Sequence, residues 1–252
     1  MNRWRGKTAV VTGAASGIGA AITDILLEEG INVAAFDIQY DRLKNKETLL
    51  TSGETRGKLF PVKCDLTKES EILDAFDWVK NNLSGVDVMI NNAGIMDYSK
   101  IIGIYFVSID SLMIEVNFLA VAICTREAVS SMRSRDVEGH IFNINSVLGH
   151  EIPEGVLHKG WNLYPSCKHA TVTMASVVRR ELIDVKAKVR MTSISPGLVK
   201  TEIASRVPEL KDFFEKNPTL LPSDVADAII YALGTRPEVQ ITELTIRLTG
   251  EP

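Results

Sequence analysis

The sequence predicts a single α/β domain built on a doubly wound parallel sheet of about seven strands, with helices on both faces. One observation is an alternation, in which short apolar, β-rich runs are separated by longer segments of helical period. A second is that strand cores such as Ala9-Val10-Val11 and 33–36 are almost continuously apolar, as burial on both faces requires. A third is a glycine-rich turn directly after the first strand, at 12–19.

The strands are expected at about 7–12, 31–37, 58–64, 86–91, 140–146, 188–195 and 241–248. No internal repeat or low-complexity tract interrupts this pattern, so residues 1–252 are interpreted as one dinucleotide-binding domain of the Rossmann type. Two connections are longer than the fold requires, at about 148–162 and 197–221. Both follow the carboxyl ends of strands, where open parallel sheets bind ligands, so they are the expected substrate loops.

Local signals predict where several helices begin. Thr67 and Ser223 are interpreted as N-caps, because acidic residues follow each of them in the expected first turn. Pro165 lacks an N–H group and is tolerated only in the first turn of a helix. Tyr164 is therefore expected at a helix N-terminus.

Composition excludes several classes of protein. The chain has 252 residues, 45% of them hydrophobic and 24% charged, and a net charge of −4, with no block rich in Lys and Arg. We therefore expect no nucleic-acid partner. The polar start resembles no signal peptide, and the longest apolar run, 116–124, is too short to span a bilayer. A cytoplasmic protein without a membrane span is expected.

The cysteines and histidines predict no metal site. Three cysteines, Cys64, Cys124 and Cys167, are an odd number without ligand spacing, which is typical of a reducing compartment. No pair among the histidines near Tyr164 has convincing ligand spacing, so these are interpreted as surface or loop residues: His150, His158 and His169.

The turn at 12–19, Thr-Gly-Ala-Ala-Ser-Gly-Ile-Gly, predicts a dinucleotide site. Gly13 permits the tight turn, Gly17 allows the backbone to approach a pyrophosphate, and Gly19 allows close packing of helix on strand. The N-terminus of the following helix faces the anion, and its dipole favours negative charge there.

Asp37 ends the second strand and favours NAD over NADP. A carboxylate at this position accepts hydrogen bonds from both hydroxyls of the adenosine ribose. The same charge repels a 2′-phosphate by about 4 kcal/mol per unit charge at ~4 Å and an effective dielectric near 20. Neither Ser16 nor Ile38 supplies a cation, and Arg42 is the one nearby candidate that the sequence indicates.

Two further strand ends carry polar residues. Asp65, followed by Leu66, is a candidate acceptor for the adenine amino group. The turn of Asn91, Asn92, Ala93 and Gly94 is expected to bring backbone close to the adenosine ribose. Taken alone, either segment is better interpreted as a turn or a cap than as a cofactor contact.

Tyr164 and Lys168 are four residues apart, which stacks a phenol against an ammonium on one helical turn. A free phenol titrates near 10, so proton transfer at pH 7 to 9 requires a fixed positive neighbour. Lys168 is that neighbour, and the N-terminal end of the helix dipole also favours the phenolate. The pair is therefore a candidate acid/base.

Together these segments resemble the short-chain dehydrogenase/reductase family, in order and across nearly the whole chain. The motifs that carry the resemblance are the glycine turn, Asn-Asn-Ala-Gly at 91–94, Asn117, Ser146, Tyr164 with Lys168, and Pro196-Gly197. Residues 124–128 and 139–146 look like the branch that contains dehydrogenase/reductase SDR family member 11 and insect farnesol dehydrogenases. That branch usually has arginine at the end of the second strand and uses NADP, whereas this chain has Asp37-Ile38.

The resemblance implies roles for individual residues. Tyr164 is the general acid/base, Lys168 lowers its pKa and binds the nicotinamide ribose, Ser146 holds the substrate oxygen, and Asn117 anchors a water in a proton relay. Ser146 lies 18 residues before Tyr164, which is longer than the commonest spacing. Pro196-Gly197 turns the chain past the nicotinamide, Val199 lies at the carboxamide and Thr201 near the phosphates. The expected cofactor residues are Gly13, Ser16, Gly17, Ile18, Gly19, Asp37, Ile38, Asp65, Leu66, Asn92, Ala93, Gly94, Tyr164, Lys168, Pro196, Gly197, Val199 and Thr201.

The sequence thus predicts an NAD-dependent oxidoreductase for an apolar alcohol, of steroid or isoprenoid kind, or its carbonyl. The two long loops are rich in apolar side chains, namely Leu148, Val156, Leu157, Trp161, Ile203, Val207, Leu210 and Phe213. These residues predict an apolar substrate, with packing in a dimer contact or a lid as the alternatives. Two alternatives stay open: an NADP-linked carbonyl reductase, and a catalytically silent dinucleotide-binding regulatory protein. The resemblance also implies a homodimer or homotetramer.

Overall fold

The computed structural model describes residues 1–50, 57–97, 100–102, 107–152, 161–203 and 217–250. Seven strands in this part of the chain form one parallel sheet in the order β3-β2-β1-β4-β5-β6-β7. They are β1 (Thr8–Thr12), β2 (Asn32–Asp37), β3 (Leu59–Lys63), β4 (Val88–Asn91), β5 (Gly139–Ile144), β6 (Val189–Pro196) and β7 (Glu243–Ile246). Each strand lies where the sequence predicts one, and the doubly wound fold is confirmed.

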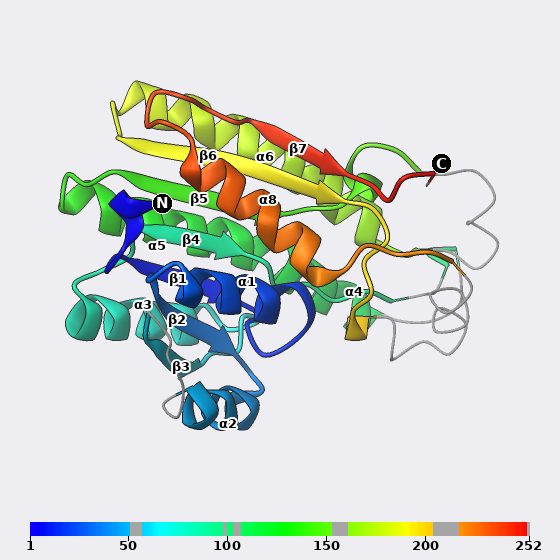
Figure 1. The fold of residues 1–252 in the computed structure, drawn as a ribbon. Helices are drawn as coiled ribbons and strands as arrows, with labels where there is room; N and C mark the ends of the chain where they lie inside the picture. Colours follow the sequence, from blue (N-terminus) through cyan, green and yellow to red (C-terminus); the bar gives the residue numbers. More distant parts are fainter. Residues whose placement is uncertain (51–56, 98–99, 103–106, 153–160, 204–216, 251–252) are drawn as a thin grey trace.

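Helices cover both faces of the sheet (Figure 1). The longer ones are α1 (Gly17–Glu28), α2 (Tyr40–Leu50), α3 (Glu69–Leu83), α4 (Val107–Ile114), α5 (Ala120–Ser134), α6 (Tyr164–Asp184) and α8 (Pro222–Gly234). Three shorter segments are η1 (Asn2–Trp4), η2 (Glu115–Leu119) and η3 (Val147–Gly149). The segment η2 is a π-helix that connects α4 directly to α5. These three elements therefore form one long helix with a π-helical segment in its middle.

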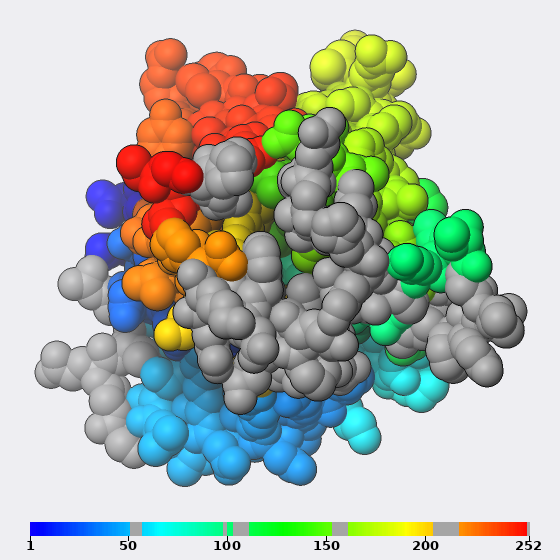
Figure 2. Space-filling view, turned by 90° about the vertical axis from the view of Figure 1, so that its right-hand side faces the viewer, coloured from blue at the N-terminus to red at the C-terminus, as the bar shows by residue number. Residues whose placement is uncertain are grey.

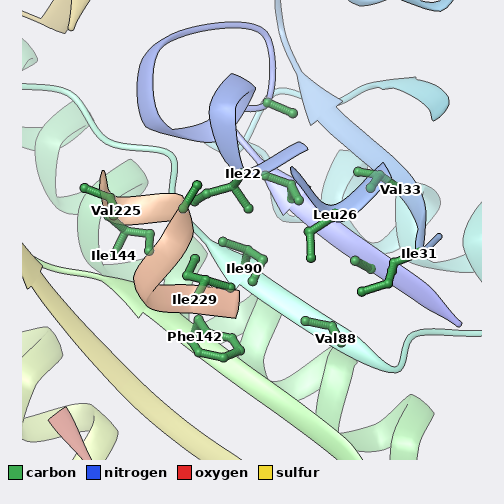
Figure 3. Packing of buried hydrophobic residues seen from close by; sticks show 14 of the residues in the cluster. Ile22, Leu26, Ile31, Val33, Val88, Ile90, Phe142, Ile144, Val225 and Ile229 are labelled. Carbon is green, nitrogen blue, oxygen red and sulfur yellow. The ribbon is translucent and has the colours of Figure 1, made fainter. Parts of the chain in front are cut away.

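Two apolar layers fix the helices to the sheet because neighbouring residues of a strand point to opposite faces. On one face, Ile22 and Leu26 of α1 and Ile229 of α8 pack on Ile90 and Phe142 of the sheet (Figure 3). On the other face, residues of α3, α5 and α6 pack on the alternate strand positions, among them Val10, Met89 and Ile141. Strands β1 and β4 lie side by side in the middle of the sheet, where the direction of winding reverses. In this fold the crevice outside the carboxyl ends of these strands receives the ligand.

Both predicted N-caps are wrong. Helix α3 has Lys68 as its N-cap, one residue beyond Thr67, whose hydroxyl donates to Asp65 Oδ1 at 2.8 Å. Helix α8 begins at Pro222, and the backbone N–H of Leu221 donates to the Asp224 carboxylate at 2.7 Å. The prediction for Pro165 is confirmed, since α6 begins at Tyr164 with the proline in its first turn.

Candidate active site

The glycine turn lies at the carboxyl end of β1 and leads into α1. Gly13 and Gly17 have φ values of +66° and +51°, which favour glycine. A Cβ on Gly19 would lie 2.1 Å from the Gly13 carbonyl oxygen, so close packing of helix on strand requires a glycine there. The Ser16 side chain makes no capping hydrogen bond to α1. The N–H groups of the first helical turn are therefore presented without a side-chain cap.

Asp37 is held beside this turn by two backbone donors. Its Oδ2 accepts from the Ala15 N–H at 3.0 Å, and its Oδ1 accepts from the Gln39 N–H at 2.8 Å. The carboxylate is 7% exposed, whereas the next side chain, Ile38, is 59% exposed. Each carboxylate oxygen has a second lone-pair position, so both oxygens retain capacity to accept a further hydrogen bond.

A hollow of about 370 Å³ follows the Asp37 strand end, and two cationic side chains, Arg42 and Lys63, line it. It is lined by residues 38–42 and by Lys63. Lys63 is the register neighbour of Asp37 on β3, so the expectation that Arg42 is the one nearby cation is wrong. The sequence hides this neighbour because it comes from a different strand.

Asp65 and Leu66 follow β3 and face different surroundings. Asp65 Oδ1 accepts from the backbone N–H and the hydroxyl of Thr67, and Lys68 Nζ lies 3.2 Å from Oδ2. Burial acts to raise the pKa of the Asp65 carboxyl, but the hydrogen bonds from Thr67 and Lys68 outweigh it and lower the pKa. Leu66 lies near Ala93 and Thr12, at the carboxyl ends of the strands.

Asn92 braces the glycine turn. Its Nδ2 donates to the Thr12 carbonyl at 2.9 Å and to the Gly13 carbonyl at 3.3 Å. The backbone N–H groups of Asn92 and Ala93 both donate to the Thr12 hydroxyl. The polar turn after β4 therefore fixes the turn after β1 across the neighbouring strand ends.

Asn117 occupies the π-helix η2 and is almost fully buried, with 1% of its surface exposed. Its Oδ1 accepts from the Ile95 N–H and its Nδ2 donates to the Ile95 carbonyl, both at 2.8 Å. A Cβ placed on Gly94 would lie 3.5 Å from Asn117 Oδ1 and 4.0 Å from Lys168 Nζ. Asn117 thus fixes the turn after β4 beside Lys168, at a helical irregularity of the kind found at functional sites.

Tyr164, Lys168 and Ser146 converge at the N-terminus of α6. Lys168 Nζ donates to the Ile144 carbonyl at 2.8 Å and lies 5.5 Å from the centre of the Tyr164 ring. Ser146 Oγ accepts from the Leu148 N–H at 3.1 Å, and Ser146 also hydrogen-bonds Tyr164. All three side chains are at most 9% exposed. The structure therefore brings together the phenol, ammonium and hydroxyl that the sequence places up to 22 residues apart.

The pKa values of the pair depart from the sequence-based expectation. Burial raises the pKa of the Tyr164 phenol to about 12, although the hydrogen bond with Ser146 acts in the opposite direction. Burial also lowers the pKa of the Lys168 ammonium to about 8. The expectation that Lys168 brings Tyr164 towards neutral pH is not met in this structure, because desolvation of the phenolate dominates.

A family model described as short chain dehydrogenase matches residues 7–212. The chain belongs to the short-chain dehydrogenase family. A farnesol dehydrogenase from Aedes aegypti is 40% identical over 255 residues, covering 100% of this chain and 99% of the relative. Dehydrogenase/reductase SDR family member 11 from Gallus gallus is 40% identical over 258 residues, with the same coverage. Among solved structures, an alcohol dehydrogenase from Thermococcus sibiricus complexed with 5-hydroxy-NADP has a TM-score of 0.80, 26% identity and 95% coverage of each chain.

This short-chain dehydrogenase is an NAD(P)-dependent alcohol dehydrogenase/reductase. Two features of this chain fit a nicotinamide dinucleotide. The first turn of α1 has no side-chain cap, and Asp37 is buried beside it with acceptor capacity remaining.

The segment after β6 crosses the glycine turn of this short-chain dehydrogenase. Pro196 ends β6, and the Gly197 N–H donates to the Ile246 carbonyl at 2.7 Å. Val199 forms an isolated parallel bridge with Leu220. A Cβ on Gly17 would lie 3.2 Å from the Thr201 side chain. Of the predicted residues of this segment, Thr201 therefore lies beside the glycine turn.

The expected substrate loops are described only in part. Leu148 and Trp161 pack with Tyr164 and with Met113 of α4 in a small buried cluster, supported by Ile95, Met96 and Leu163. Ile203 lies in the described segment after Thr201. Met113 was not predicted, because nothing in its local sequence distinguishes it from another core methionine. The remaining predicted loop residues, Val156, Leu157, Val207, Leu210, Phe213 and His158, lie outside the described residues.

The other two predicted loop histidines have defined partners. His150 Nε2 lies 2.9 Å from Ser195 Oγ and 2.5 Å from Glu243 Oε1, and so joins the segment after β5 to β7. His169 Nδ1 lies 3.0 Å from the Pro165 carbonyl, on the first turns of α6.

Two structural features are absent from the described residues. No helix among them is long and apolar enough to cross a membrane. No group of three or more His, Cys, Asp or Glu side chains there is arranged to hold a metal ion.

Proposed function

We propose that this chain is an NAD-dependent oxidoreductase that interconverts an apolar secondary or allylic alcohol and its carbonyl. The observation that carries the proposal is the buried group of Tyr164, Ser146 and Lys168, which borders an apolar cluster at the same end of the sheet as Asp37. Figure 2 looks onto this end of the molecule. A hydrophobic substrate and a dinucleotide approaching from this end would meet at the phenol.

The proposed residues divide the proton chemistry between them. The bound nicotinamide supplies or accepts the hydride. A phenol with a pKa of about 12 holds its proton at neutral pH, so Tyr164 is set to donate to the oxygen of a carbonyl substrate. Ser146 orients that oxygen, since a hydroxyl both donates and accepts. Lys168, with its pKa lowered to about 8, contacts the nicotinamide ribose and moves a proton to or from Tyr164 through it. Asn117 holds the turn of residues 92–95 in place.

The other proposed cofactor contacts follow the dinucleotide from adenosine to nicotinamide. Asp37 accepts from the adenosine ribose, and Asp65 and Leu66 lie at the adenine. The backbone of the glycine turn, with Ser16 and Ile18, lies at the pyrophosphate. Val199 lies at the carboxamide and Thr201 at the phosphates. Because Asp37 repels a 2′-phosphate, NAD is the preferred cofactor.

The proposed substrate is isoprenoid- or steroid-like. Support comes from the apolar cluster of Met113, Leu148 and Trp161 around Tyr164, and from the 40% identity to a farnesol dehydrogenase over the full chain. We place the enzyme in the cytoplasm, because its three cysteines are buried free thiols and free thiols are typical of a reducing compartment.

The proposed assembly is a homodimer or homotetramer. Short-chain dehydrogenases commonly form oligomers through the long helices that contain the relay asparagine and the tyrosine. Leu119 at the end of η2 and Val177 and Ile183 on α6 are 46%, 48% and 74% exposed. Association of these helices would bury that apolar surface.

The test follows absorbance at the NADH band with farnesol and a panel of hydroxysteroids. Tyr164→Phe is expected to lower the rate by a factor of about 10²–10⁴, the usual contribution of a positioned acid/base, while NAD affinity stays nearly intact. Tyr231→Phe, on the exposed surface of α8, is the matched control and should retain full activity. A near-wild-type rate for Tyr164→Phe would overturn the assignment.

The second candidate is an NADP-linked carbonyl reductase. It is favoured by the two cations in the hollow beside Asp37, Arg42 and Lys63. Tighter binding of NADP than of NAD would select it. No turnover of any alcohol despite tight NAD binding would instead select a catalytically silent dinucleotide-binding protein.

A further inference from the structure

Arg42 and Glu202 form a bidentate ion pair between segments that are 160 residues apart in the sequence. Arg42 Nη1 donates to Glu202 Oε2 at 2.8 Å, and Nη2 donates to Oε1 at 2.9 Å. Arg42 Nη1 also lies 3.2 Å from the side-chain oxygen of Gln39. A guanidinium held in this way presents both terminal nitrogens to one carboxylate, which is the geometry it would otherwise use towards a phosphate.

The pair spans two sides of the proposed cofactor groove. Arg42 lies in the first turn of α2, directly after the Asp37 strand end. Glu202 follows Thr201, whose side chain packs on Gly17 at the start of α1. The carboxylate therefore reaches α2 from the segment that crosses the glycine turn.

The guanidinium also lines the hollow of about 370 Å³ beside Asp37. Asp37 carries the adenosine ribose in the proposed function, so a phosphate on the 2′-oxygen of that ribose would point towards this hollow. There it would meet the Asp37 carboxylate and an arginine whose charge is already balanced by Glu202. Lys63 is the other cation that lines the hollow.

We propose that Glu202 is a specificity-determining residue that disfavours NADP by engaging Arg42. This inference rests on the proposed dinucleotide function and adds a residue to it that lies outside the ribose contact. Glu202 acts through Arg42, so it is a positioning residue. Its removal should free Arg42 for a 2′-phosphate and leave NAD binding, which has no phosphate at that position, unchanged.

The test is equilibrium binding of NADP and of NAD by isothermal titration calorimetry, without any substrate. An ion pair with side chains 45% and 60% exposed contributes up to about 1 kcal/mol, which corresponds to about fivefold in affinity. Glu202→Gln is therefore expected to bind NADP about fivefold more tightly, with NAD affinity unchanged within about twofold. In the Arg42→Gln background the same substitution should give no gain.

Glu47→Gln is the matched control, because it removes a carboxylate paired with Lys44 on the same helix and should alter neither affinity. An unchanged NADP affinity in Glu202→Gln would overturn the inference. So would an equal shift for NAD, or a gain that persists without Arg42. A wild-type protein that binds NADP more tightly than NAD contradicts the proposed cofactor instead; even then, a gain in NADP affinity for Glu202→Gln that requires Arg42 supports the inference, and no gain overturns it.

Discussion

Asn117→Ala should destabilise the protein by about 2–4 kcal/mol, because one side chain satisfies two backbone groups of another segment. The amide of Asn117 forms two hydrogen bonds of 2.8 Å with Ile95, one as acceptor and one as donor. Truncation leaves both Ile95 groups without their partner, at a cost of about 1–3 kcal/mol for each buried polar group. Ile95 is only partly buried, so water replaces some of the loss, and about 1–2 kcal/mol per group is the appropriate figure.

The assay is urea unfolding monitored by tryptophan fluorescence. The slope of the unfolding free energy against urea concentration should be the same in variant and wild type, which checks two-state behaviour. Asn82→Ala is the matched control, since its one side-chain bond, to the Trp78 carbonyl at 2.8 Å, lies on the exposed surface of α3. Its loss should cost no more than about 0.5 kcal/mol. A loss below about 1 kcal/mol for Asn117→Ala, or one equal to that of the control, would refute the role assigned to the Ile95 contact.

Two further predictions concern the cofactor and acid stability. Asp37→Ala should weaken NAD binding about 100-fold, because two ribose hydrogen bonds to a charged group contribute at least about 1.5 kcal/mol each. NADP binding should not weaken, because the substitution also removes the repulsion of the 2′-phosphate. Calorimetry that finds NAD unaffected contradicts the ribose contact. His140 is fully buried, and burial holds its pKa well below 6.5. The His140 imidazole therefore binds a proton more readily in the unfolded chain than in the folded one. The contribution of neutral His140 to the free energy of unfolding is complete above about pH 6.5 and is lost as the pH falls below it. The melting temperature should decrease less between pH 7 and pH 5 in His140→Gln than in the wild type. An equal decrease in both proteins would contradict the assignment.

Local sequence patterns predicted the elements of this fold well. Apolar runs such as Val33 to Phe36 favour strands that are buried on both faces, and the seven strands lie at the predicted positions. The glycine turn and Pro165 were also sufficient to place the starts of α1 and α6. These signals act over a few residues, through backbone conformation and periodicity. The N-caps predicted at Thr67 and Ser223 are wrong because neither helix begins at the predicted residue: α3 has Lys68 as its N-cap, and α8 has Leu221 as its N-cap and begins at Pro222.

Contacts between distant segments were invisible in the sequence. Nothing local indicates that Asn117 bonds Ile95, that Lys63 is the neighbour of Asp37, or that Glu202 engages Arg42. The prediction that Lys168 lowers the Tyr164 pKa is wrong for the same reason. Spacing along a helix places Lys168 near the phenol, but the pKa depends on how far both groups are removed from water.

The sequence by itself determined the order of strands and helices along the chain, the glycine-rich turn after β1 and the types of residue available for proton transfer. Tertiary structure alone decided which of these side chains meet, how deeply the Tyr164 and Lys168 pair is buried and which charges face the hollow beside Asp37. The physical reason is that conformational preference is a property of a short segment. Desolvation and long-range pairing arise only when separate segments pack together.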